Sequence, residues 1–191
     1  MNKYKKLAAI ISFFMLGSVV LAWMITEASH GTQAGYQGRL YIIDSDVAVE
    51  LYVLKNGTYQ LQSNLESDPL IEIDLLEPGK NQKYRFDIIN NNSVTAAVKI
   101  NFADINGDIE VLKNALIFSS SNPEAFTFTL NDRLEYDEDG EIYFAKFYDE
   151  VRIEANSRKS IFWSIEVDKD AGNEIENKTL SIEKAIFTKP T

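Results

Sequence analysis

The segment 168–174, DKDAGNE, holds the side chains best suited to bind a metal ion. It places Asp168, Asp170 and Glu174 on one short loop around a flexible glycine, and calcium prefers oxygen ligands of this kind. We predict these three carboxylates as calcium ligands. Because the same residue types favour turns, a plain turn that binds no cofactor is the alternative.

Two further acidic clusters have the composition of turns. Residues 104–108, DINGD, space oxygen atoms at alternate positions like the start of a calcium loop, but Ala115 stands where such a loop needs a bidentate glutamate. Residues 137–141, DEDGE, contain an Asp-Gly pair that favours a hairpin. We therefore predict an ordinary β-turn at 104–108 and a solvated hairpin tip at 137–141.

The sequence lacks the side chains of most catalytic sites. Its only histidine is His30 in a polar segment, and it has no cysteine. A Ser-His-Asp triad, a histidine zinc site and a cysteine nucleophile are therefore excluded. A pair of carboxylates for glycoside hydrolysis is not excluded by residue type, because Asp and Glu together number 29. We predict that the protein is not an enzyme.

The first 38 residues have the layout of an export segment and a linker. Residues 1–6, MNKYKK, are basic, and residues 7–25 carry no charge. We predict a signal peptide or membrane anchor at 1–28, with cleavage after Ala28 as one option and retention of 7–25 in the membrane as the other. Residues 29–38 are small and polar, which indicates a flexible linker. The predicted location is secreted or on the extracellular cell surface.

The remaining residues, 39–191, alternate with a period of two and predict one all-β domain. Turn pairs separate the short apolar runs, among them Asn56-Gly57, Pro78-Gly79 and a further turn at 106–108. About nine such runs favour a β-sandwich of jelly-roll or Greek-key type. The segment 109–120 permits a short helix or a strand. The net charge of −10 argues against a nucleic-acid partner and leaves the N-terminal segment as the contact with membrane.

Two segments resemble the TasA/camelysin family of exported Gram-positive proteins. They are residues 75–102, LLEPGKNQKYRFDIINNNSVTAAVKINF, and residues 160–187, SIFWSIEVDKDAGNEIENKTLSIEKAIF. The resemblance implies a jelly-roll sandwich on the cell surface or in the biofilm matrix, in which the N-terminal segment of one subunit completes the sheet of the next. Camelysin has been classed as a metalloprotease, but this chain has no set of histidines that could bind zinc.

Two functions follow as expectations. The first is a surface or matrix structural protein that associates with itself by strand addition, with residues 29–44 as the donor segment. The second is a monomeric adhesion or binding module, for calcium or for a surface glycan. In that module a set of aromatic side chains would line one face: Tyr52, Tyr59, Tyr143, Tyr148 and Trp163. Other matrix or cell-surface components are the expected partners in either case.

Overall fold

The computed structural model describes residues 34–37, 40–43, 47–62, 69–73, 77–122 and 125–190. The chain divides into two compact units, Met1–Ala34 and Gly35–Thr191, and the second contains nearly all of the described residues. The predicted export segment at 1–28, the linker residue His30 and half of the donor segment 29–44 lie outside the described residues. In the part of the chain that is described, no helix is long and apolar enough to cross a membrane.

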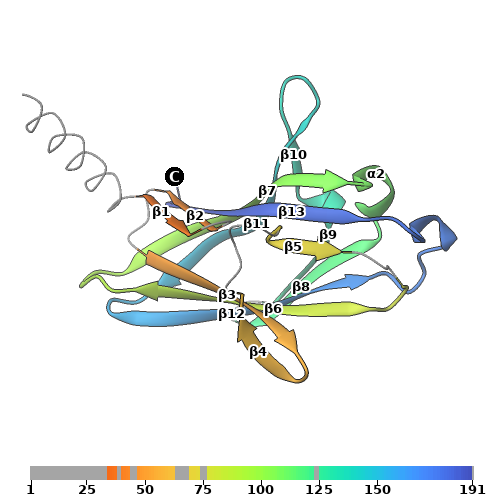
Figure 1. Ribbon diagram of the computed structural model, residues 1–191. Coiled ribbons are helices and arrows are strands. Elements are labelled where there is room, and N and C mark those ends of the chain that lie inside the picture. Colours follow the sequence, from red (N-terminus) through yellow and green to blue (C-terminus); the bar gives the residue numbers. More distant parts are fainter. Residues whose placement is uncertain are drawn as a thin grey trace, which may run out of the picture. The chain divides into compact units, whose positions relative to one another are not determined.

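The second unit is a β-sandwich, which confirms the predicted fold class (Figure 1). One sheet has seven strands in the order β1-β2-β13-β7-β11-β10, with β5 also paired to β13. Its strands are β1 Ala34–Gln37, β2 Leu40–Ile43, β5 Ile71–Ile73, β7 Ala96–Gly107, β10 Leu134–Tyr136, β11 Ile142–Ile153 and β13 Leu180–Thr188.

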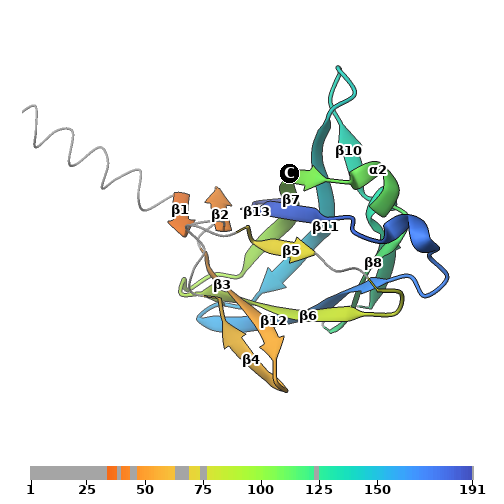
Figure 2. The same cartoon turned by 45° about the vertical axis from the view of Figure 1, so that its right-hand side comes forward.

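The other sheet has six strands in the order β4-β3-β6-β12-β8-β9, and both views show it as a second layer (Figures 1 and 2). The non-consecutive neighbours require the chain to cross between layers, as Greek-key connections do. The strands are β3 Val47–Lys55, β4 Thr58–Leu61, β6 Asn81–Asn90, β8 Leu116–Asn122, β9 Phe126–Thr129 and β12 Ser157–Val167. The short helices are α2 Ile109–Leu112, η1 Leu130–Asp132 and η2 Asn173–Ile175.

The core lies between the sheets and is filled by alternate residues of each strand. In β12, Ile161, Trp163 and Ile165 are buried, whereas the residues between them are partly exposed. Because successive strand residues point to opposite faces, this alternation fixes which side chains line the outer surface. Trp163 packs near Tyr84, Phe86, Phe102 and Phe147, with ring centroids 4.5, 5.3, 5.5 and 4.8 Å away.

Most predicted turns are confirmed. Asn56 and Gly57 have φ of 52° and 77°, which is the backbone of a two-residue hairpin turn joining β3 to β4. The segment 109–120 contains both permitted structures, α2 followed by β8. The turn predicted at 106–108 is misplaced. Gly107 is still part of β7, where it pairs with Leu180 of β13, and the chain turns only at Asp108.

Strand β2 attaches to the sandwich as a short strand parallel to β13. It pairs with β13 over three positions, from Leu40 opposite Ala185 to Ile42 opposite Phe187. Leu40 and Ile42 are nevertheless fully buried, at 0% and 3% exposure. The burial of these two side chains therefore attaches the segment to the sandwich more than its backbone pairing with β13 does.

Candidate functional site

The outer face of the six-stranded sheet carries an unusual mixture of rings and charged groups. Three rows of side chains cross its central strands, because β6 pairs with β3 and β12 in continuous register. Strand β12 also pairs with β8, with a register shift between Phe162 and Trp163. The first row is Lys83, Ser164 and Ser119. The second is Tyr52, Arg85 and Phe162, and the third is Glu50, Asp87 and Ser160.

The β3–β4 hairpin folds over this face and forms one wall of a pocket. Tyr59 lies on β4, three strands from Phe162 on β12, which is about 14 Å in a flat sheet. The two ring centroids are nevertheless 5.5 Å apart in an edge-to-face arrangement. The hairpin therefore curls out of the sheet plane, as the position of β4 in Figure 2 shows.

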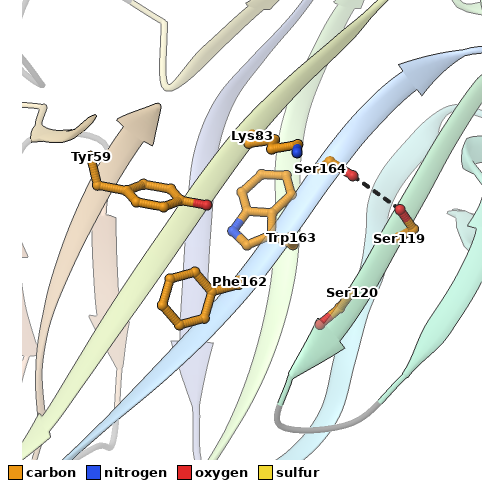
Figure 3. A pocket seen from close by; sticks show the side chains of 7 residues that line it. All are labelled: Tyr59, Lys83, Ser119, Ser120, Phe162, Trp163 and Ser164. Atoms are coloured by element: carbon orange, nitrogen blue, oxygen red, sulfur yellow. Dashed lines mark hydrogen bonds between the residues drawn. The ribbon is translucent and has the colours of Figure 1, made fainter. Parts of the chain in front are cut away.

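The pocket beneath Tyr59 has a volume of about 450 Å³ and is open to solvent (Figure 3). The hydroxyl oxygens of Ser119 and Ser164 lie 3.0 Å apart within it. The pocket thus combines two half-buried rings with a pair of hydroxyls and one ammonium group. Its lining residues are Tyr59, Lys83, Ser119, Ser120, Phe162, Trp163 and Ser164.

A network around Asp87 holds the neighbouring part of the face. Asp87 points outward yet is only 2% exposed, because Arg85, Arg158 and Ser160 cover it. Ser160 Oγ donates to Asp87 Oδ1 at 2.7 Å, and Arg158 Nη1 donates to Oδ2 at 3.3 Å. Arg85 Nε lies 3.0 Å from Oδ1 as an ion pair but is not oriented for a hydrogen bond. The charge of the buried carboxylate is therefore compensated on more than one side.

Arg85 connects this network to the aromatic rings. Its guanidinium carbon lies 4.0 Å from the ring centroid of Tyr52, 5.3 Å from that of Tyr59 and 5.9 Å from that of Phe162. A cation over an aromatic face is attracted by the ring quadrupole, so Arg85 links rings from three strands. The Tyr52 hydroxyl donates to Glu50 at 2.8 Å, and that bond raises the pKa of Tyr52. These contacts hold the rings in place on the sheet.

The predicted calcium residues do not converge in this structure. Asp168 Oδ1 accepts the backbone N–H of Asp170 at 2.9 Å, and Glu174 Oε1 accepts the N–H of Gly172 at 3.1 Å. Among the described residues, no group of three or more histidine, cysteine or acidic side chains is placed to hold a metal ion. Each carboxylate serves its own turn here, and calcium binding by the loop stays a prediction.

The predicted set of aromatic residues is divided by the structure. Tyr52 and Tyr59 lie on the outer face described above, whereas Tyr148 and Trp163 are buried in the core. Tyr143 is 67% exposed but belongs to β11 in the other sheet. These five tyrosine and tryptophan residues therefore do not form one face.

Sequence reasoning missed three central residues of the site, Phe162, Arg85 and Asp87. The adjacent pair Phe162-Trp163 conceals which ring faces outward, because both are apolar. The polar residues at positions 158, 160 and 164 of β12 alternate with the buried positions 161, 163 and 165, and this alternation is the signal that places Phe162 on the outward face.

Comparisons with known proteins do not assign this chain to a family. No protein-family model matches it, and no curated protein matches it. Among solved structures, it is similar to a mutant of the carbohydrate-binding module CBM3b from the cellulosomal cellobiohydrolase 9A of Clostridium thermocellum. The identity is 11%, the TM-score 0.28, and the match covers 76% of this chain and 99% of that one.

A second similar structure is the CBM3a-L domain with flanking linkers from a scaffoldin of the cellulosome of Clostridium thermocellum. Here the identity is 10% and the TM-score 0.26, with 76% of this chain and 90% of the other covered. With TM-scores this low, neither likeness supports an inference about the ligand of this chain.

Proposed function

We propose that this protein is an exported, non-catalytic surface or matrix protein that binds an extracellular polysaccharide on the outer face of its six-stranded sheet. The pocket under Tyr59 carries the proposal, because it joins the rings of Tyr59 and Phe162 to the Ser119–Ser164 hydroxyl pair. A sugar ring has apolar C–H faces and a rim of hydroxyls. It fits a site in which aromatic rings supply contact area and a few polar groups set orientation.

The preorganisation of the site supports binding. Arg85 is held among three rings and beside Asp87, so few side chains need to be ordered when a ligand arrives. Each immobilised side chain would otherwise cost about 0.5–1.5 kcal/mol of binding free energy. A rigid, partly apolar face on the sheet suits recognition of an extended polymer.

The exported and non-catalytic parts of the proposal rest on the sequence. The basic residues 1–6 precede the uncharged stretch 7–25, and the single histidine supplies no nucleophile–base pair. The resemblance of residues 75–102 and 160–187 to the TasA/camelysin family agrees with a place on the cell surface or in a biofilm matrix.

The proposal is tested by affinity gel electrophoresis of the native exported protein in gels that contain different neutral and acidic polysaccharides. At least one polymer should retard the protein, and Phe162→Ala should lower the affinity about tenfold, since a stacked ring contributes about 0.5–1.5 kcal/mol beyond the area that it buries. Tyr143→Ala is the matched control, because Tyr143 is exposed on the other sheet. Equal mobility of all variants in every gel would contradict the proposal.

A second candidate function is self-association through β2. The specific observation is that this N-terminal segment, with three paired positions, inserts Leu40 and Ile42 into the core. The equivalent segment of a second copy would satisfy the same edge of β13. Size-exclusion chromatography of the native protein across concentration tests this idea. A monomer at all concentrations, including the highest, would refute it.

A further inference from the structure

We infer that the polysaccharide bound at this face carries carboxylate groups, and that Lys83 is the residue that selects for them. This inference rests on the proposed function and names the chemical class of its ligand. Its basis is the distribution of charge around the pocket.

The other cations of the face are already neutralised by acidic partners. Arg85 pairs with Asp87, and Arg158 pairs with both Asp87 and Glu50 at 3.3 and 3.5 Å. Lys83 is exposed, and among the described residues its ammonium has no ion pair or hydrogen bond. It is also the only charged residue among those that line this pocket.

The position of Lys83 places its charge where a sugar acid would lie. Lys83 is opposite Ser164, which is opposite Ser119, so one ammonium and two hydroxyls form a row across β6, β12 and β8. A sugar ring against Tyr59 and Phe162 would present its ring substituents to this row (Figure 3). A carboxylate there gains a charge-assisted hydrogen bond, whereas a neutral substituent gains an ordinary one.

Glu166 opposes this preference and supplies a second test. It follows Ser164 by two positions on β12 and therefore faces the same side of the sheet. With a net charge of −10 for the whole chain, the protein repels polyanions in general. Selective binding of an anionic polymer must therefore come from a local cation, which at this pocket is Lys83.

The test compares two polymers with the same backbone, polygalacturonate and fully methyl-esterified polygalacturonate. We expect the native protein to bind the acid form about fivefold more tightly in ~0.05 M salt, with the preference lost in ~0.5 M salt. Lys83→Gln should abolish the preference, and Glu166→Gln should strengthen binding of the acid form about twofold. Lys169→Gln, at an exposed turn lysine, is the charge-matched control and should change neither affinity.

Poly(glycerol phosphate) distinguishes a sugar acid from a phosphate polymer, because it has charge but no ring to stack on Phe162. We expect it to bind more weakly than polygalacturonate, by about tenfold. Tighter binding of this polymer would overturn the inference in favour of phosphate. Equal affinity for the two pectic polymers, no binding of polygalacturonate, or unchanged preference in Lys83→Gln would also overturn it. The proposed function survives these results if Phe162→Ala still weakens binding of a neutral polysaccharide, and fails if no polysaccharide binds.

Discussion

Replacement of Asp87 by alanine tests whether the charged network around this residue stabilises the folded protein or contributes nothing to its stability. The substitution removes a carboxylate that is 2% exposed and leaves the cations of Arg85 and Arg158 without their shared partner. Breaking a fully buried ion pair costs about 3–5 kcal/mol, and breaking an exposed pair costs less than about 1 kcal/mol. The side chains of Arg85 and Arg158 are 22% and 51% exposed, so water can replace part of the loss.

An intermediate loss of about 2 kcal/mol in the free energy of unfolding is therefore expected for Asp87→Ala. Urea denaturation followed by tryptophan fluorescence measures it, and the melting temperature should fall by about 6 °C. Asp149→Ala is the control, because its contact with Arg133 is 3.8 Å long and Asp149 is 75% exposed. This control should lose less than about 0.5 kcal/mol. An Asp87→Ala variant as stable as the control would refute the reasoning.

Three further predictions concern the scaffold. Ile42→Ala should cost about 2–3 kcal/mol in urea denaturation, because Ile42 is 3% exposed; a loss below about 0.5 kcal/mol would mean that β2 is not docked. Gly107→Ala should lower the free energy of unfolding by about 3 kcal/mol, because φ is +107° and a Cβ would lie 2.3 Å from Thr179 O. Gly140→Ala is the control and should lower it by only about 1 kcal/mol, because φ is also positive there but no atom lies within 4 Å of the added Cβ. The carboxylate of Asp108 accepts the N–H of Thr179, and this bond lowers the pKa of Asp108. Asp108→Ala should therefore destabilise the protein at pH 7, and the difference in free energy of unfolding between wild type and variant should shrink as the pH falls below ~4. Urea denaturation of both proteins at a series of pH values measures this difference, and a difference that does not depend on pH would contradict the prediction.

The strand content of the domain was predictable because turn chemistry and alternation agree locally. Asn56-Gly57 is a clear example, since its positive φ angles are those that the residue pair favours. Gly107 shows the limit of such local signals. Its neighbours look like a turn, but pairing with Leu180, more than 70 positions away in the chain, keeps it in β7. Pairing over such distances cannot be read from a local pattern.

The site was less predictable because it depends on the curvature of a hairpin. Tyr59 and Phe162 are 103 positions apart in the sequence, and their contact requires β4 to fold over two intervening strands. Asp87 looks like an ordinary surface acid in an alternating strand, yet two arginines and a serine bury it. Tertiary packing, rather than residue type, makes these residues a site.

The most direct test of polysaccharide binding is isothermal titration of the native protein with the polymer that retards it most strongly, carried out for wild type, Tyr59→Ala, Phe162→Ala and Tyr143→Ala. The outer-face account predicts a roughly tenfold weaker affinity for the first two variants, with melting temperatures close to wild type, and wild-type affinity for Tyr143→Ala. Wild-type affinity for Tyr59→Ala and Phe162→Ala would contradict it.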